Sequence, residues 1–259
     1  MILKPAQRQV IYTALEGIPL IRPRDRLSTT VLEAAEATGL KLASHDILVL
    51  AQKIVSKAEG RCVDLATVVP SKRAEELARI CLKDPRLVEV ILSESAAVIR
   101  CRPNILIVEH RLGFIVANAG VDMSNVDQND GERVLLLPSD PDATSAQLKS
   151  EIDAALSIDI GVIINDSFGR PWRNGVIGAA LGAAGIPALA SMIGAPDLFG
   201  RAMRVTEVAY ADELAAAASL LMGQCNEGLP VVHVRGAHWD RKSAPAATLV
   251  RRRELDLFR

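Results

Sequence analysis

The sequence predicts a mixed α/β fold (α+β), in which helices flank one large mixed sheet. Short apolar runs rich in β-branched residues recur along the chain and are typical of buried strands. Segments with helical apolar spacing alternate with these runs. The 259 residues are enough to bury a large core in a single domain. A Pro-, Asp- and Ser-rich stretch at 127–147 indicates a connection that could divide this domain into two lobes.

The nearly neutral net charge argues against highly charged binding partners. Thirty Lys and Arg residues face thirty-one Asp and Glu residues, which gives a formal net charge of −1. A nucleic acid or an anionic membrane surface therefore has no global electrostatic attraction to this chain. We expect a site for small molecules, with no nucleic-acid or membrane partner.

The cysteines and the first residues indicate the cellular compartment. The four cysteines are far apart and form no CxxC pair, which argues against zinc and for a reduced protein; they are Cys62, Cys81, Cys101 and Cys225. The N-terminus carries Lys4 and Arg8 among broken apolar runs, unlike a secretory signal. Both observations predict a cytoplasmic protein.

The first third of the chain is predicted to alternate strands with helices. The expected elements are a strand and turn within 9–21, a helix over 28–39, a buried strand over 46–51 and a helix over 70–83. Ser28 and Ser71 are candidate N-caps of the two helices, and Gly39 closes the first. Glu75 and Arg79 form an i, i+4 pair on the second helix.

The rest of the chain continues this alternation. The expected elements are apolar segments at 88–92 and 96–100, a hairpin over 105–117, a helix over 145–156, a strand over 161–164, helices over 176–184 and 205–221, and a strand over 231–234. Residues 176–196 carry no charge and are long enough to cross a bilayer. Ala and Gly make up more than half of them and Pro187 interrupts them, so we expect a buried helix up to Ala184, in which Gly178 and Gly182 allow close packing.

Polar residues follow the apolar strand at 161–164. Asn165, Asp166 and Ser167 come directly after it, and ligands of open α/β sheets bind at such strand ends. A carboxylate beside a hydroxyl suits Mg²⁺ or Mn²⁺, and Arg170 and Arg173 could meet phosphate or carboxylate. The simpler alternative is that Asp166 and Ser167 cap a following helix and the arginines are solvated.

The same pattern recurs after the strand at 114–117, where small polar residues surround Asp122. Two carboxylates that converge on divalent cations could clamp a polyphosphate during phosphoryl transfer. Lys53 and Lys57 follow the strand at 46–51, either as a phosphate cradle or as an exposed helix face. The chain contains neither GxxxxGK[ST] nor GxGxxG, so any nucleotide site is of another type.

A third polar loop lies between the predicted helix at 205–221 and the strand at 231–234. Gly223 and Gly228 bracket Gln224, Asn226 and Glu227. These residues are either a third wall of the site or ordinary loop polarity.

Several long motifs occur in one order along nearly the whole chain: AQKIVSKAEGR, HRLGFIVANAGVDMSNVD, NDSFGRPWRNGVIGAALGAAGI, MGQCNEGLPVVHVRG and the terminal DLFR. Together they resemble the coenzyme F420-0:L-glutamate ligase family, the gamma-glutamyl ligases. The resemblance implies GTP-dependent attachment of L-glutamate to the terminal carboxylate of the coenzyme precursor, in some members with further gamma-linked glutamates. It also implies Mg²⁺ or Mn²⁺, sometimes K⁺, and an intertwined homodimer.

The resemblance also implies roles for individual residues. Asp122 and Asp166 look like metal ligands, and Ser167, where the family has Thr, and Gln224 look like ligands of a second metal. The implied nucleotide contacts are Gly17, Ile18, Pro19, Leu20, Gln52, Lys53, Lys57, Asn125, Gly223, Gln224, Glu227 and Gly228. His110, Arg111, Arg170 and Arg173 lie in matching motifs without an individual role, and Cys225-Asn226 is a variable spot.

The implied chemistry agrees with the residues. Joining a carboxylate to an amine needs an activated acyl group, and transfer of the GTP γ-phosphate would give an acyl phosphate. Two alternatives are a related nucleotide- and metal-dependent ligase for another acid or amine, and a regulator that only binds nucleotide.

Overall fold

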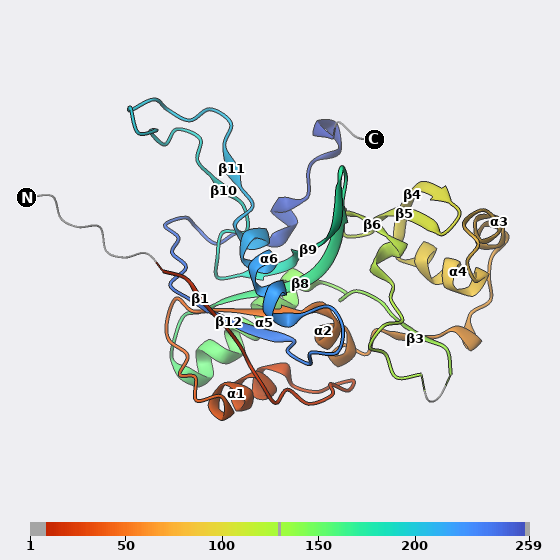
Figure 1. Cartoon of the computed structure of the whole chain (residues 1–259), viewed down its shortest axis with the longest axis horizontal. Coiled ribbons are helices and arrows are strands. Elements are labelled where there is room, and N and C mark those ends of the chain that lie inside the picture. The colour runs from red at the N-terminus through yellow and green to blue at the C-terminus, as the bar shows by residue number, and fades with distance from the viewer. Residues whose placement is uncertain (1–8, 129–130, 257–259) are drawn as a thin grey trace, which may run out of the picture.

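The computed structural model describes residues 9–128 and 131–256 (Figure 1). Residues 1–8, whose sequence is unlike a secretory signal, lie outside the described residues. So do residues 257–259, the last three of the DLFR motif. The centre of the structure is a five-stranded sheet in the order β1-β12-β2-β8-β9. Its strands are β1 (Ile11–Ala14), β12 (Val231–Arg235), β2 (Ile47–Ala51), β8 (Gly161–Arg170) and β9 (Arg173–Ala184). Only the β2–β8 pair of this sheet is parallel, so the predicted large mixed sheet is confirmed.

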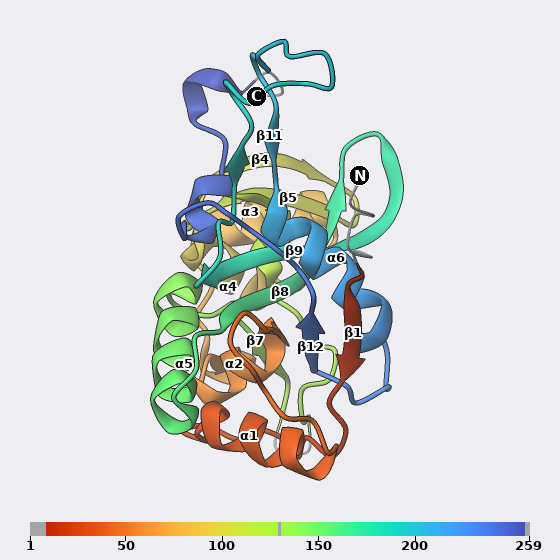
Figure 2. The same cartoon turned by 90° about the vertical axis from the view of Figure 1, so that its left-hand side faces the viewer.

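Helices cover both faces of this sheet (Figures 1 and 2). Alternate strand residues point to opposite faces, so Leu48 and Leu50 enter one core while Ile47 and Val49 enter the other. The first core includes residues of α1 (Leu27–Ala37), α2 (Gln52–Ala58) and α5 (Pro141–Leu156). The second core is closed by α6 (Tyr210–Met222) and by the 3₁₀ helix η3 (Ala246–Leu249).

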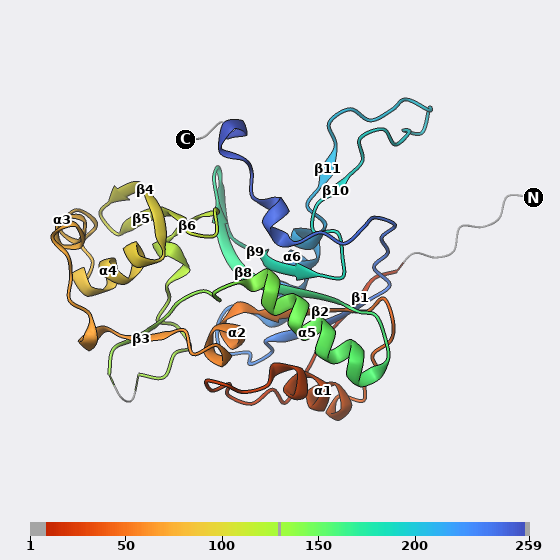
Figure 3. The same cartoon turned by 180° about the vertical axis from the view of Figure 1, so that it is seen from behind.

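Residues 62–136, here called the insert, lie beside the sheet (Figures 1 and 3). The insert contains β3 (Cys62–Asp64), η1 (Leu65–Thr67), α3 (Lys72–Cys81), α4 (Pro85–Ser93), β4 (Ser95–Arg102), β5 (Ile105–His110), β6 (Ile115–Ala117), η2 (Asn118–Gly120) and β7 (Arg133–Leu135). A third core cluster consists entirely of its residues. The insert begins and ends side by side, because Cys62 pairs with Leu135. That the insert is a separate lobe of a single domain stays a prediction.

An arm extends away from the second core (Figures 1 and 2). Its base is the short ladder of β10 (Ala190–Ser191) and β11 (Glu207–Val208), and residues 192–206 form its loop. The arm carries large apolar side chains in water, above all Leu198 at 99% and Phe199 at 91% exposure. The chain then ends the described part with η4 (Arg253–Leu255).

Most predicted elements are confirmed, and several of the differences lie at helix starts. Ser71 caps α3 by accepting a hydrogen bond from Ala74 N at 3.2 Å, and the Glu75–Arg79 pair forms. Ser28 is not a cap, because α1 begins at Leu27 and the Ser28 hydroxyl donates to Glu151. Two further helices begin elsewhere than predicted: α5 starts at Pro141 and α6 at Tyr210.

The predicted helix over 176–184 is wrong, because these residues belong to β9. Ala and Gly carry no strong periodicity, so the sequence does not distinguish a buried helix from a buried strand. Pairing with β8 along its length decides for the strand. The predicted close packing is present nonetheless, since an added Cβ at Gly182 would lie 2.2 Å from Pro141 O of α5. No helix in the described residues is both long and apolar enough to span a membrane.

Candidate active site

The predicted site residues meet at one edge of the large sheet. β2 ends at Ala51, which lies beside Asn165 of the parallel strand β8, and α2 begins at the next residue, Gln52. The carboxyl ends of parallel strands are where loops and ligands gather in α/β sheets. The antiparallel neighbour β12 begins at this edge, and Ala51 N donates to Pro230 O at 2.8 Å. Segments far apart in sequence therefore share one edge.

The prediction that a strand ends before Asp166 is wrong. β8 continues to Arg170, and Asp166 and Ser167 lie inside it, opposite Ala179 and Gly178 of β9. The alternative of a helix N-cap is wrong for the same reason, because the chain turns back as a strand. The register shifts between Ile164 and Asn165, where β9 carries one extra residue, Leu181, opposite β8.

Asp122 and Asp166 form the acidic centre of the site together with Lys53. Lys53 Nζ lies 2.7 Å from Asp122 Oδ2 and interacts electrostatically with Asp166. Burial opposes ionisation of Asp122, but hydrogen bonds from Lys53 and Ser124 outweigh it, so the pKa of Asp122 lies below its usual value. Burial, with a smaller contribution from the like charge of Asp122, raises the pKa of Asp166 to about 6 against the opposing effects of Ser167 N–H and Lys53. The two carboxylates thus converge on shared positive charge.

Ser167 contacts the loop after α6, which is the predicted third wall of the site. The Ser167 hydroxyl donates to Gln224 Oε1 at 2.8 Å, so the two residues predicted to bind a second metal touch each other. Asn125 Nδ2 donates to Cys225 O at 3.0 Å and ties the Asp122 loop to this wall. The Glu227 carboxylate accepts from Cys225 N at 2.8 Å.

Glycine is required at the start of this loop. Gly223 has φ +70°, and an added Cβ would lie 2.0 Å from the Glu227 carboxyl carbon. Gly228 closes the loop before β12. The predicted third wall is therefore at the site, while its contacts with nucleotide stay a prediction.

The first turn of α2 faces the carboxylates. Gln52 is buried, accepts from Ser56 Oγ at 2.9 Å and hydrogen bonds to Asp166. Lys57 lies one turn further and is half-buried; burial and the like charge of Lys53 lower its pKa. Within the part of the chain that the structure describes, Lys57 makes no ion pair. The lysines are thus partly buried cations close together, rather than a solvated helix face.

The segment Gly17–Leu20 runs along the same edge. It follows Leu15, whose N–H donates to Val231 O at 2.9 Å. Ile18 packs against the first core, whereas Leu20 is almost fully exposed. The segment therefore lies close to the edge at which we expect a ligand to bind. Its contact with nucleotide stays a prediction.

The four residues without an assigned role separate into two pairs. Arg170 and Arg173 face each other at the turn of the β8–β9 hairpin, where Arg170 Nη1 donates to Gly175 O at 3.3 Å. His110 and Arg111 lie instead in the insert, next to Glu94. Glu94 was not predicted as important, because its partners lie many residues away along the chain and leave no local spacing signal.

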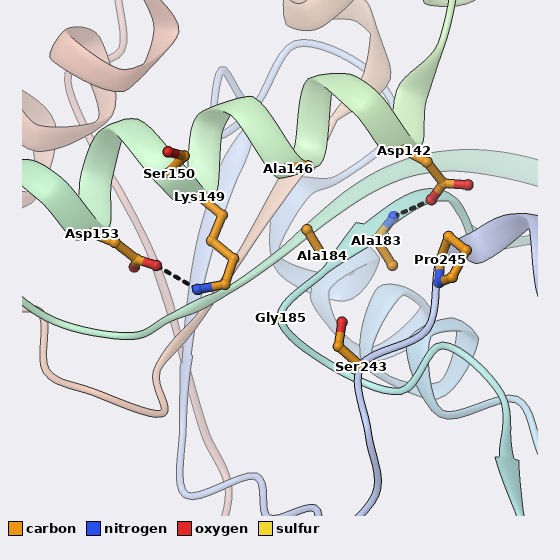
Figure 4. A pocket seen from close by; sticks show the side chains of 10 residues that line it. All are labelled: Asp142, Ala146, Lys149, Ser150, Asp153, Ala183, Ala184, Gly185, Ser243 and Pro245. Carbon is orange, nitrogen blue, oxygen red and sulfur yellow. Dashed lines mark hydrogen bonds and ion pairs between the residues drawn. The ribbon is translucent and has the colours of Figure 1, made fainter.

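A separate cavity of about 500 Å³ lies between α5 and the end of β9 (Figure 4). Its charged groups are already paired: Lys149 contacts Asp153 and Asp159, and Asp142 accepts from Ala183 N at 2.8 Å and Ala246 N at 2.7 Å. Asp142 thereby joins α5, β9 and η3. We conclude that this cavity is a structural junction rather than the candidate active site.

The oxygen donors at the sheet edge fit a hard divalent cation. No group of three or more His, Cys, Asp or Glu side chains that could hold a metal exists in residues 9–128 and 131–256. The set consists instead of two carboxylates with a hydroxyl and an amide oxygen, from Asp122, Asp166, Ser167 and Gln224. Mg²⁺ sites commonly use one or two carboxylates and complete their coordination with water and substrate phosphate.

Comparison with known proteins identifies the family of this chain. A family model described as F420-0:Gamma-glutamyl ligase matches residues 17–236. The chain is 44% identical to the coenzyme F420:L-glutamate ligase of Methanothermobacter thermautotrophicus over 95% of this chain and 97% of that protein. The proteins of the same name from Methanopyrus kandleri and Methanocaldococcus jannaschii are 42% and 39% identical, over 95% and 98% of this chain and 97% and 98% of their own lengths. On this evidence the chain belongs to the F420-0:gamma-glutamyl ligase family.

Proposed function

We propose that this protein uses GTP to attach L-glutamate to the terminal carboxylate of the coenzyme F420 precursor, and that it can add further gamma-linked glutamates. Family membership supports the acid and the amine. The observation that best supports phosphoryl transfer is the interaction of Lys53 with two carboxylates, Asp122 and Asp166, close to a second partly buried lysine, Lys57. Such a mixed site attracts both a divalent cation and a polyphosphate.

The proposed reaction has two steps. The precursor carboxylate attacks the γ-phosphorus of GTP, GDP leaves, and an acyl phosphate forms. The deprotonated amine of glutamate then attacks the acyl carbon, and phosphate leaves and takes up the proton that the nitrogen gives up. Lys53 and Lys57 neutralise charge on the transferring phosphoryl group, and Gln52 orients Asp166. Mg²⁺ or Mn²⁺, held by Asp122, Asp166, Ser167 and Gln224, would supply charge neutralisation at the phosphates, and we propose K⁺ as a further activating cation.

Mass spectrometry of the product tests this function directly. Purified protein is incubated with GTP, Mn²⁺, L-glutamate and the glutamate-free precursor, with either KCl or NaCl. We expect a product heavier by one or more glutamyl residues and an equal amount of GDP. GTP turnover without this product would favour a ligase for another acid or amine, and GTP binding without turnover would favour a regulator.

The lysines of α2 provide a second test. We expect Lys53→Met and Lys57→Met each to weaken GTP binding or turnover by about 1.5–3 kcal/mol, the strength of a charge-assisted phosphate contact. The dependence of initial rate on GTP concentration measures this loss. Lys83→Met, in the insert and outside the site, is the control. Unchanged GTP dependence in both α2 variants would remove the phosphate cradle from the proposal.

We also propose that the protein is a homodimer in which the arm packs on a second copy. In a monomer, large apolar side chains of the arm are exposed to water. They include Ile193, Leu198, Phe199 and Val205. Large exposed apolar patches mark interaction sites. A second copy is the occupant we propose because family resemblance implies an intertwined homodimer.

Light scattering after gel filtration measures the assembly. We expect the wild-type protein to have the mass of a dimer and Phe199→Asp combined with Leu198→Asp to shift it to a monomer. Val69→Asp is the matched control, because Val69 is 86% exposed but lies in the insert. A monomeric wild-type protein, or a dimer that survives the paired substitution, contradicts this arrangement.

A further inference from the structure

An ionic cluster around the buried Glu94 links the insert to Arg61, the residue just before it, and has no part in the chemistry above. We call Arg61, Glu94, His110 and Arg111 the Glu94 cluster. One oxygen, Glu94 Oε2, lies 2.7 Å from Arg61 Nη2, 3.0 Å from Arg111 Nε and 3.6 Å from His110 Nε2. Although burial opposes ionisation, contacts with His110, Arg111 and Arg61 lower the pKa of Glu94 to about 2. Glu94 is thus an anion at every pH of interest.

His110 is held in one orientation within this cluster. Its ring is fully buried, and Nδ1 accepts a hydrogen bond from Leu112 N at 3.0 Å. With Nδ1 as the acceptor, Nε2 is the ring nitrogen that faces Glu94, 3.6 Å from its Oε2. This arrangement fixes the ring plane, and the cluster is more than a solvated ion pair.

The cluster lies where the chain crosses between the sheet and the insert. Arg61 belongs to the outgoing crossing, and its Nε donates to Leu137 O of the returning crossing at 3.0 Å. Arg61 O also accepts from Leu136 N at 2.9 Å. Arg111 Nη2 reaches Ser139 O of the same returning segment at 3.4 Å. Glu94 and its cations therefore join both crossings to the insert.

Aromatic rings extend this connection to the strand that carries Asp166. His110 stacks on Phe114, with ring centres 4.8 Å apart and planes 5° from parallel. Phe114 in turn lies 5.3 Å from Phe168 of β8. Phe168 is two residues after Asp166 and so lies on the same face of the strand. Packed groups thus run from Glu94 to Phe168, which lies on the strand that carries Asp166.

The acidic centre needs such a connection because its carboxylates come from different parts of the molecule. Asp122 belongs to the insert, whereas Asp166 belongs to the large sheet. We infer that the Glu94 cluster is a positioning device: it fixes the insert against β8 and so holds Asp122 opposite Asp166 for a divalent cation. The cation part of this inference rests on the proposed function. Glu94, His110 and Arg111 are positioning residues and contact no reacting group.

Glu94→Gln tests the device, because it keeps the side-chain shape and removes the charge. The first measurement is binding of Mn²⁺ alone, by electron paramagnetic resonance, well below the melting temperature of each variant. We expect the Mn²⁺ affinity to fall by about tenfold or more, as when outer partners of metal ligands are replaced. The second is hydrogen exchange in peptides covering residues 59–64 and 133–139, which we expect to become faster.

Glu132→Gln is the matched control. Glu132 pairs with Arg86 at 2.6 Å in the same insert, but on its surface. We expect this variant to retain wild-type Mn²⁺ affinity and wild-type exchange at both crossings. This control shows whether the loss of an ion pair elsewhere in the insert has the same effect as the loss of the Glu94 charge.

Two milder variants keep the test decisive if Glu94→Gln does not fold. Arg111→Gln removes a partly exposed partner of Glu94, and Phe114→Leu interrupts the aromatic connection while leaving the charges in place. Both should weaken Mn²⁺ binding in a folded protein. If the folded variants melt earlier yet bind Mn²⁺ and exchange at the crossings like wild type, the cluster only stabilises the insert and the inference is wrong. If wild type itself binds no Mn²⁺, the proposed metal site fails, and the exchange measurement still decides whether the cluster fixes the crossings.

Discussion

Replacing Asp166 by asparagine is expected to lower glutamyl ligation by about 100-fold or more, the scale seen when one preorganised electrostatic group is removed from a phosphoryl or acyl transfer site. The substitution keeps the side-chain shape but removes one of the two carboxylate charges that offset a bound cation. Asp122→Asn should have a similar effect, and it also removes the negative charge 2.7 Å from Lys53 Nζ. Initial rates of product and GDP formation at saturating substrates measure both losses.

Metal-free stability distinguishes this electrostatic role from a structural one. The pKa of Asp166 is raised to about 6, so the folded protein holds a proton there that the unfolded chain releases near pH 4. Ionisation in the buried site therefore destabilises the fold as pH rises from 4 to 6, by about 3 kcal/mol in full. Asp166→Asn lacks this cost.

Thermal melting in the presence of a metal chelator measures this pH-dependent stability. The Asp166→Asn variant should be more stable than wild type at pH 7–8, and the difference should vanish below about pH 4. A variant that is less stable at neutral pH and still active would mean that Asp166 supports the fold and not the reaction.

Replacing Gly182 by alanine is expected to destabilise the protein by about 3 kcal/mol or more, at the upper end for an overpacked site. The added Cβ would lie 2.2 Å from Pro141 O and 2.3 Å from its carbonyl carbon. These are backbone atoms at the start of α5, so they cannot rotate away. Gly178→Ala should act similarly on the other face, where the Cβ would lie 2.4 Å from Ala215 O of α6. Chemical denaturation of each variant measures the loss.

Gly169→Ala is the matched control for these variants. Gly169 lies in the same hairpin, and an added Cβ would meet nothing within 4 Å. We expect a change within about 0.5 kcal/mol, as for most surface substitutions. Equal stability of the Gly169 and Gly182 variants would show that β9 does not pack as closely on α5 as described.

The elements best predicted from the sequence are those whose residue types favour one kind of secondary structure. Val, Ile and Leu runs such as Ile47–Ala51 read as buried strands and are confirmed. The sequence predicts a helix over residues 176–184, which form part of a strand, because small Ala and Gly residues pack closely in either element. The prediction of close packing at Gly178 and Gly182 was correct, since it depends on side-chain size and not on the element.

The candidate site follows the same rule. Asp122 and Asp166 each stand among small polar residues after an apolar run, and that local contrast identifies them. Their convergence depends on the β2–β8 pairing and on the loop after η2, which no spacing reveals. Glu94 has no local signal at all, because Arg61 and Arg111 reach it from 33 and 17 residues away.

The adjacent ends of the insert have a consequence for protein engineering. A segment that leaves and re-enters a domain at paired residues, here Cys62 and Leu135, can be exchanged without displacing what flanks it. Such an exchange between relatives would transplant Asp122 and Asn125 together with the rest of the insert, while Lys53, Asp166 and Gln224 stay with the recipient. Chimeras made at this junction would therefore recombine two parts of the candidate active site.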